Sequence, residues 1–172
     1  MKKLLITRML ITGMALSSTA FAADGVIHFT GKVVDNVCNV SPTLNVTMDD
    51  VSIDIFHAIG DRANPKDFAL VLTDCPDTLN TASIQLDGTA NASDLDTFQL
   101  DNAGQPGVAS GVGLEVKSHS GVVAPGGATD PWPLDKVTGT NSLPFTASYK
   151  MTDDKITAGN ANVSVQFSVI YN

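Results

Sequence analysis

Several residue types on which many enzymes and nucleic-acid-binding proteins depend are scarce in this sequence. Only 10 of the 172 residues are lysine or arginine, against 18 aspartate and glutamate residues, so the formal net charge is −8. A surface this acidic disfavours binding to nucleic acid and to anionic lipid. Glu115 is the only glutamate. Because aspartate favours turns and glutamate favours helices, this bias is typical of a loop-rich β protein.

Recognisable catalytic and metal-binding motifs are also missing. No C-x-x-C, H-x-x-x-H or G-x-S-x-G spacing occurs, and no serine or cysteine stands in an arrangement typical of a nucleophile. The aspartate pairs at residues 49–50 and 153–154 could be acid/base groups or calcium ligands. They lack the spacing of a calcium loop, so we interpret them as solvated turn residues. The histidines stand singly: His28, His57 and His119. We therefore expect neither an enzyme nor a bound cofactor or metal.

An apolar run occurs at the N-terminus, but it is too short to span a bilayer as an anchor. Residues 1–8 are basic, residues 9–16 are apolar, and Ala20-Phe21-Ala22 follows. These are the three parts of a secretory signal peptide, so we expect residues 1–22 to be removed. The mature chain would have 150 residues, enough for one domain with a proper core, and a net charge of about −11.

Cysteine is limited to Cys38 and Cys75. An exported chain with an even number of cysteines most simply forms one disulfide in an oxidising compartment. That bond would close a loop of about 37 residues and stabilise the fold by roughly 4 kcal/mol in the chain-entropy model. The alternative, a metal-binding pair, lacks nearby ligands.

Two stretches at opposite ends of the mature chain have the apolar face of a half-buried strand; the C-terminal one alternates strictly, with Ile170 as its only exception. In residues 26–34, apolar side chains share a face with Gly31, and glycine weakens a strand by about 0.5–1 kcal/mol unless something bulky approaches there. Both stretches could be ordinary strands of a closed sandwich. We interpret the C-terminal one instead as bordering a vacant position in a sheet, and the N-terminal one as filling such a position in another copy or subunit. The alternating apolar residues are Ile27, Phe29 and Val33 at one end, and Val163, Val165, Phe167, Val169 and Tyr171 at the other.

Between these ends the sequence has many short strand-like stretches separated by turn residues, and no long helix, which predicts an antiparallel β-sandwich. Residues 51–56 fit either a strand or a helical turn, and residues 60–66 and 121–133 are expected to be loops. Trp132 could be a binding platform or a loop anchor. Strands are expected at residues 44–48, 68–72, 83–88, 97–100, 112–117 and 143–151.

Four short motifs lie in order along the mature chain. Residues 23–38 read A-D-G-V-I-H-F-T-G-K-V-V-D-N-V-C, residues 72–75 have the form L-x-x-C, and residues 143–149 contain P-F-x-A-x-Y. Gly159 is fourteenth from the C-terminus and Tyr171 is penultimate. Together these motifs resemble the pilins of the chaperone–usher pathway, in particular the subunits of type 1 fimbriae.

The resemblance implies an all-β, incomplete immunoglobulin-like sandwich that lacks its last strand and is completed by a donor strand. Residues 35–172 would be the pilin domain, and residues 23–34 would be the donor-strand extension, running into the first strand. The donor residues would be Ile27, Phe29, Gly31 and Val33. The groove and chaperone-recognition residues would be Gly159, Val163, Val165, Phe167, Val169 and Tyr171.

The resemblance also implies three kinds of partner: a periplasmic pilus chaperone, an outer-membrane usher and neighbouring pilin subunits. The chain would pass through the periplasm to a fimbrium on the cell surface. It lacks the additional N-terminal lectin domain of a tip adhesin, so we expect a structural subunit, major or minor, that supports cell adhesion as part of the fibre. The alternatives are a monomeric secreted immunoglobulin-like binding module and a sandwich enzyme of the copper/zinc dismutase kind, for which the scattered histidines are unsuited.

Overall fold

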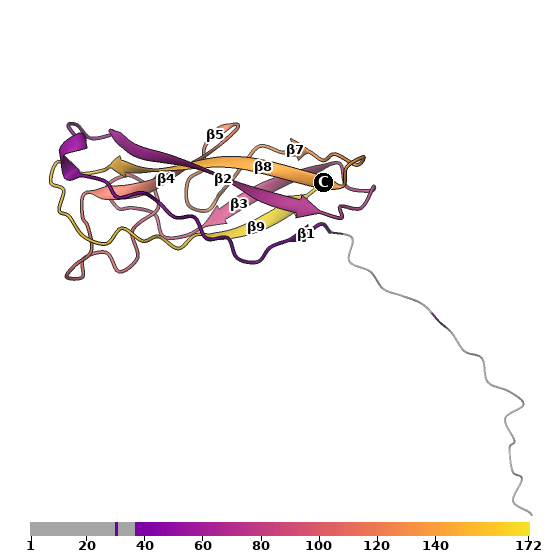
Figure 1. Cartoon of the computed structure of the whole chain (residues 1–172), viewed down its shortest axis with the longest axis horizontal. Coiled ribbons are helices and arrows are strands. Elements are labelled where there is room, and N and C mark those ends of the chain that lie inside the picture. Colours follow the sequence, from indigo (N-terminus) through magenta and orange to yellow (C-terminus); the bar gives the residue numbers. More distant parts are fainter. Residues whose placement is uncertain (1–29, 31–36) are drawn as a thin grey trace, which may run out of the picture. The chain divides into compact units, whose positions relative to one another are not determined.

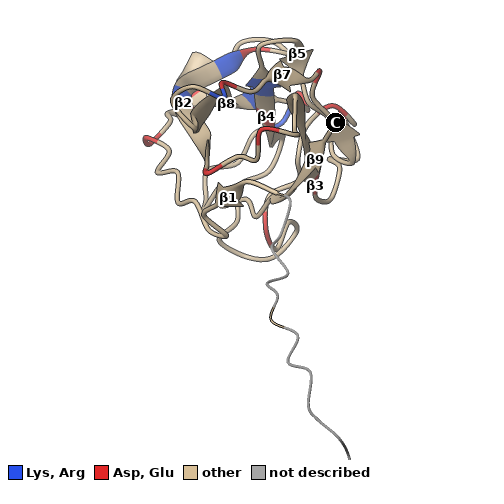
Figure 2. Cartoon of the chain, turned by 90° about the vertical axis from the view of Figure 1, so that its right-hand side faces the viewer, with Lys and Arg blue, Asp and Glu red and all other residues tan. Residues whose placement is uncertain are grey.

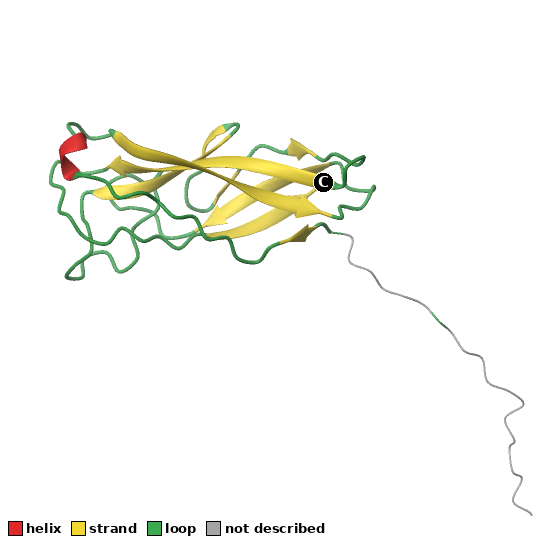
Figure 3. Ribbon diagram, in the orientation of Figure 1, coloured by secondary structure: helices red, strands yellow, loops and turns green. Residues whose placement is uncertain are grey.

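The computed structural model describes Thr30 and residues 37–172. The predicted signal peptide and, apart from Thr30, the predicted N-terminal extension lie outside the described residues. The regular secondary structure of the described part consists of strands and one short 3-10 turn, joined by long loops (Figure 3). In chain order its elements are β1 (Asn39–Val40), the 3-10 turn η1 (Ile53–Ile55), β2 (Arg62–Thr73), β3 (Thr81–Asp87), β4 (Val112–Ser118), β5 (Gly121–Val122), β6 (Gly127–Ala128), β7 (Trp132–Pro133), β8 (Thr140–Met151) and β9 (Gln166–Tyr171).

The strands form two antiparallel sheets, as predicted for a sandwich (Figure 1). The larger sheet has the order β1-β2-β8-β4-β5, and the two 12-residue strands β2 and β8 pair along most of their length. The smaller sheet is built around β3. Ala82 of β3 pairs with both Trp132 and Tyr171, and Gln85 pairs with both Ala128 and Ser168. Strands β6 and β7 therefore share one edge of β3, and β9 takes the other.

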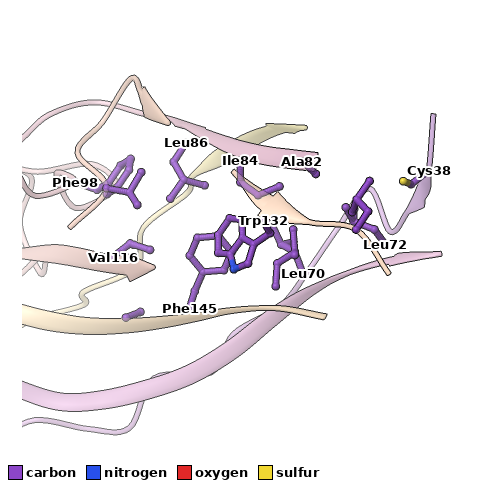
Figure 4. Close-up of a cluster of buried hydrophobic side chains, with 14 of the residues drawn as sticks. Cys38, Leu70, Leu72, Ala82, Ile84, Leu86, Phe98, Val116, Trp132 and Phe145 are labelled. Carbon is purple, nitrogen blue, oxygen red and sulfur yellow. The ribbon is translucent and has the colours of Figure 1, made fainter. Parts of the chain in front are cut away.

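The core lies between the sheets and follows the period-two pattern of the strands (Figure 4). Leu72 and Ile84, from opposite sheets, are both fully buried, and each such side chain contributes roughly 1.5–3 kcal/mol. The ring of Phe145 stacks on Phe68 and meets Trp132 edge-on, with ring centroids 5.4 Å apart in both pairs. Trp132 is only 9% exposed, so it anchors its loop in the core, and the platform interpretation is wrong.

The structure confirms the strands predicted at residues 68–72, 83–88, 112–117 and 143–151, and it shows η1 where a strand or helical turn was predicted. The predicted loop at residues 60–66 is wrong, because β2 already begins at Arg62. Its turn-like residues form a bulge between Ala63 and Lys66, with Asn64 in the left-handed region at φ 47°.

Other predicted elements are shorter than expected or absent. Residues 44–48 form no strand, although Val46 and Met48 are half-buried, because no strand of the described part pairs with them. Residues 97–100 contain only two isolated bridges, both at Phe98, and residues 121–133 include three two-residue strands rather than a plain loop. Alternation in a sequence reports which side chains are buried, not which backbone groups are paired.

Candidate functional site: a groove beside strand β9

One edge of β9 has no strand partner among the described residues. Strand β9 pairs with β3 from Gln166↔Asp87 to Tyr171↔Ala82, and no other described strand pairs with it. Just beyond β9, Asn172 exchanges two backbone hydrogen bonds with Thr81. In an antiparallel pair, alternate residues turn their backbone groups to the same side. The even-numbered residues of β9 therefore bond to β3, and the odd-numbered ones turn their N–H and C=O groups to the open edge.

The same odd-numbered residues carry the predicted apolar face. Phe167, Val169 and Tyr171 are half-buried against the core, whereas Gln166, Ser168 and Ile170 are exposed. Val163 and Val165, just before β9, are also half-buried and continue this face. The described residues thus present, along one line, a row of apolar side chains and a row of backbone groups that no other described strand pairs with.

A groove of about 1490 Å³ runs along this line. One side is formed by residues 159–171, and the other by residues 37–51, which include Val46 and Met48. Core side chains of both sheets, among them Leu70, Leu86 and Leu114, form its floor. All six predicted groove residues line it: Gly159, Val163, Val165, Phe167, Val169 and Tyr171.

Residues 41–50, which we call the wall segment, are attached to the domain at their two ends. At one end the predicted disulfide joins Cys38 to Cys75. Beside it, β1 pairs with β2 through Asn39↔Thr73, and the Asn39 side-chain amide donates to Asp74 Oδ2 over 2.9 Å. These contacts place the start of the wall segment against the C-terminal end of β2.

The other end of the wall segment is attached to the bulge of β2. The side-chain amide of Asn64 donates to the carbonyl oxygen of Asp50 over 2.9 Å, and Lys66 Nζ lies 3.5 Å from Asp49 Oδ2. The exposed Lys66–Asp49 pair adds little, since surface ion pairs contribute about 0–1 kcal/mol. Between the two attachments, residues 41–49 make no backbone hydrogen bond to another strand within the described part of the chain.

Residues 159–165, which we call the lead-in segment, are held by the loop of residues 101–111 instead of by β3. Asn160 exchanges backbone hydrogen bonds with Gly107 and Ala109, and its N–H···O distances are 2.8 and 3.0 Å. Asp101 donates its N–H to the Asn162 carbonyl, and its carboxylate accepts from both the N–H and the hydroxyl of Ser164. The residues predicted as one terminal strand therefore form one continuous edge of the groove, but only those of β9 belong to the sheet.

Tyr149 reaches this edge from β8. Its hydroxyl donates a 2.7 Å hydrogen bond to the carbonyl oxygen of Ala161 in the lead-in segment. Burial raises the pKa of Tyr149, so its hydroxyl stays protonated and remains a donor at neutral pH. Sequence reasoning placed Tyr149 in a strand motif but gave no sign of this contact, because the alternation of β8 does not say what a side chain meets.

Tyr171 lies at the opposite end of the groove, near the disulfide. Burial raises the pKa of its hydroxyl, and a hydrogen bond from the backbone of Cys38 opposes that shift. The penultimate tyrosine therefore joins the end of β9 to the start of the opposite side of the groove.

A second polar cluster, which the sequence did not predict, lies on the outer face of the large sheet. The side chain of Glu115 is fully buried, and its carboxylate accepts from Arg62 Nε and Nη2 over 2.6 and 2.7 Å. Lys117 Nζ lies 3.1 Å away from the carboxylate, and Lys150 Nζ bridges Glu115 and Asp94. Figure 2 shows the corresponding lysines and arginine gathered on β2, β4 and β8. Burial disfavours the charged form of Glu115, but the hydrogen bonds from Arg62 and Lys117 outweigh it and lower the pKa.

The described residues contain no grouping of histidine, cysteine, aspartate and glutamate side chains suited to a metal ion. Within residues 37–172, no helix is long and apolar enough to cross a membrane. The donor residues Ile27, Phe29, Gly31 and Val33 lie outside the described residues, so their role stays a prediction.

Comparison with known proteins gives matches along nearly the whole chain. The model of the family described as "Fimbrial protein" matches residues 27–172. The type 1 fimbrial subunit of Salmonella typhimurium is 34% identical over 99% of this chain and 100% of its own length. Among solved structures, a chaperone-usher pilus subunit superposes with a TM-score of 0.66 at 20% identity, covering 91% of this chain and all of that one. The P pilus rod subunit PapA gives a TM-score of 0.65 at 21% identity, covering 78% and 99%. These two structures bear on the fold alone.

Proposed function

Because the chain belongs to the fimbrial protein family and is a structural, non-enzymatic subunit, we propose that it polymerises by donor-strand exchange through the groove beside β9. The occupant is the N-terminal extension of another copy or of a related subunit, residues 23–34 in this chain. Residues 35–172 form the pilin domain that receives it, and residues 1–22 are removed on export. The product is a fimbrium on the cell surface that supports adhesion as a fibre.

One observation carries this proposal: the open edge of β9 and the half-buried apolar row lie along the same groove. An unpaired strand edge readily accepts another strand. Adding one here would pair the backbone groups of Val163, Val165 and the odd residues of β9, and it would cover their side chains. Burial of Ile27, Phe29 and Val33 would contribute roughly 1.5–3 kcal/mol for each side chain that is fully desolvated.

Before assembly, the same groove would need a temporary occupant. We assign that part to a periplasmic pilus chaperone, which lends a strand to the groove until the subunit reaches the outer-membrane usher. The apolar row from Val163 to Tyr171 would form the chaperone-recognition edge. A monomeric binding module is the weaker candidate, because in a closed sandwich another strand would cover this edge of β9.

Fusion of a donor strand to the chain tests the proposal. A second copy of residues 24–35, joined after Asn172 by a short flexible linker, should fill the groove of its own chain. The linker makes the step intramolecular, with an effective concentration in the millimolar range. We expect a soluble monomer that needs no chaperone and melts well above the unfused mature chain. Thermal unfolding and size-exclusion chromatography measure both properties.

The matched control replaces Gly31 in the fused copy with leucine. A small residue at this place leaves room in the groove, so the Gly31→Leu fusion should complement poorly. A one-residue slip cannot rescue it, because Ile27 and Phe29 would then face solvent. A fused chain no more stable than its parent, or equal performance of the leucine version, would contradict the proposal.

A further inference from the structure

The open edge of the C-terminal strand segment ends at a defined residue. Asn160 and Asn162 use their backbone groups to bond to the loop of residues 101–111. By the alternation of an antiparallel edge, Ala161 turns its carbonyl the other way, towards the groove. That carbonyl already accepts the hydroxyl of Tyr149 at 2.7 Å.

The next odd-numbered residues, Val163 and Val165, differ from Ala161 in their backbone hydrogen bonding. Among the described residues, nothing hydrogen-bonds to the N–H or C=O of Val163 or Val165. A strand entering the groove can therefore pair with residues 163 to 171 but meets an occupied position at Ala161. Tyr149 itself lines the groove at this end.

We propose that Tyr149 is a specificity-determining residue that fixes the register of the incoming strand by closing the edge at Ala161. The inference rests on the proposed function. The apolar face of the extension ends at Val33, because Asp35 is the next residue on that face. If the added strand is antiparallel like the other rungs of this sheet, the closed edge sets Val33 opposite Val163 and keeps Asp35 out of the groove.

A slip of two residues in one direction is the error that this arrangement prevents. It would move Val33 to Ala161 and Gly31 to Val163 while leaving every donor side chain on its proper face, so burial alone opposes it weakly. The Tyr149 hydroxyl opposes it, because it already donates to the Ala161 carbonyl on the groove side, where the backbone N–H of Val33 would have to bond.

Cysteine pairs on the solvent face of the two strands can report the register in assembled fibres of the full-length mature chain. Gln166 is exposed, and in the proposed register it lies opposite Thr30. In the slipped register it lies opposite His28. The Thr30→Cys/Gln166→Cys variant should therefore form an intersubunit disulfide, whereas the His28→Cys/Gln166→Cys variant should remain at background.

The Tyr149→Phe substitution removes only the hydroxyl. We expect it to raise cross-linking of the His28→Cys/Gln166→Cys pair about five-fold, the ratio that one net hydrogen bond supports. The control is Thr146→Val, which removes another β8 hydroxyl, the one that donates to Asp67, and leaves the Ala161 contact intact. Thr146 does not line the groove, so this substitution should not change the ratio of the two cross-links.

Equal cross-linking of both pairs while Tyr149 is present would overturn the inference, and so would a ratio unchanged by Tyr149→Phe. Even if the phenylalanine variant assembles poorly, the inference is tested by comparing the two cysteine pairs in chains that retain Tyr149. If the parent forms no fibres at all, the proposed function fails and this inference falls with it, so the two failures are distinguishable.

Discussion

Gly159 lies so close to Ala109 that a β-carbon at residue 159 would be 2.5 Å from the Ala109 amide nitrogen. It would also be 2.5 Å from the carbonyl carbon of Val108 and 2.8 Å from the carbonyl oxygen of Gly107. These neighbours are backbone atoms, which cannot rotate aside. The absence of a side chain at residue 159 is therefore what lets the lead-in segment pack against the loop of residues 101–111.

We expect Gly159→Ala to destabilise the domain by about 1–3 kcal/mol, the usual cost of forcing extra atoms into a packed site. Urea unfolding of the chain with the fused donor strand measures this, because the fusion supplies a filled groove. The matched control is Ala158→Ser, which adds one atom at the neighbouring exposed residue and should cost little. Equal stability of the alanine variant and its parent would show that the loop moves freely.

Charges placed on the groove face should abolish chaperone binding. In the Val165→Asp/Phe167→Asp variant, two carboxylates would be buried by any strand that fills the groove, at a cost of several kcal/mol. Co-purification with the chaperone from the periplasm should be lost. The control is Gln166→Asp/Ser168→Asp, which adds the same charge on the exposed face of the same strand. Unchanged recovery of the first variant would mean that the chaperone binds elsewhere.

The disulfide should stabilise the domain and hold one end of the groove. Replacing Cys38 and Cys75 with serine opens a loop spanning 37 residues, and we expect a loss of roughly 4 kcal/mol. Urea unfolding of the fused chain tests this, and titration of the denatured parent should find no free thiol. Two free thiols in the exported parent would contradict the disulfide outright.

The ion cluster of Glu115 should make stability depend on pH. Glu115→Gln removes charged hydrogen bonds from Arg62 and Lys117, and we expect a loss of about 2–3 kcal/mol at neutral pH. The pKa of Glu115 is lowered in the folded state, so its contribution is present above the unfolded pKa and is lost as the pH falls through the folded value.

The difference between parent and glutamine variant should therefore shrink in acid, below the ordinary pKa of glutamate. Urea unfolding of both fused chains across the acid range checks this, with exposed Asp67→Asn as the control for a carboxylate outside the cluster. A difference that stays constant with pH would indicate that packing, and not charge, is what the glutamine disturbs.

Sequence reasoning located the apolar row of the groove because Val163 to Tyr171 repeat at a period of two, and a repeat is visible without a structure. It placed the disulfide because export and an even count leave one pairing. It could not find the Tyr149–Ala161 hydrogen bond or the cluster around Glu115. Those contacts join residues from separate strands, and their partners depend on the pairing order, which the alternation does not encode.

The same limit explains the wrong predictions. Val46 and Met48 alternate as strand residues do, since both face the groove, yet no described strand pairs with them. Asn64 and Pro65 read as a loop because bulges and loops use the same residues.

The two sides of the groove are held differently. Strand β9 pairs with β3 over six residues, whereas within the described residues the wall segment is hydrogen-bonded to β2 only near its two ends and pairs with no strand between them. Occupants of different bulk can then be accommodated by displacement of one side without disturbing the sheets. A single binding site can in this way accept two unlike sequences in succession, and substitutions facing the wall segment should be tolerated more readily than equal changes of volume facing β9.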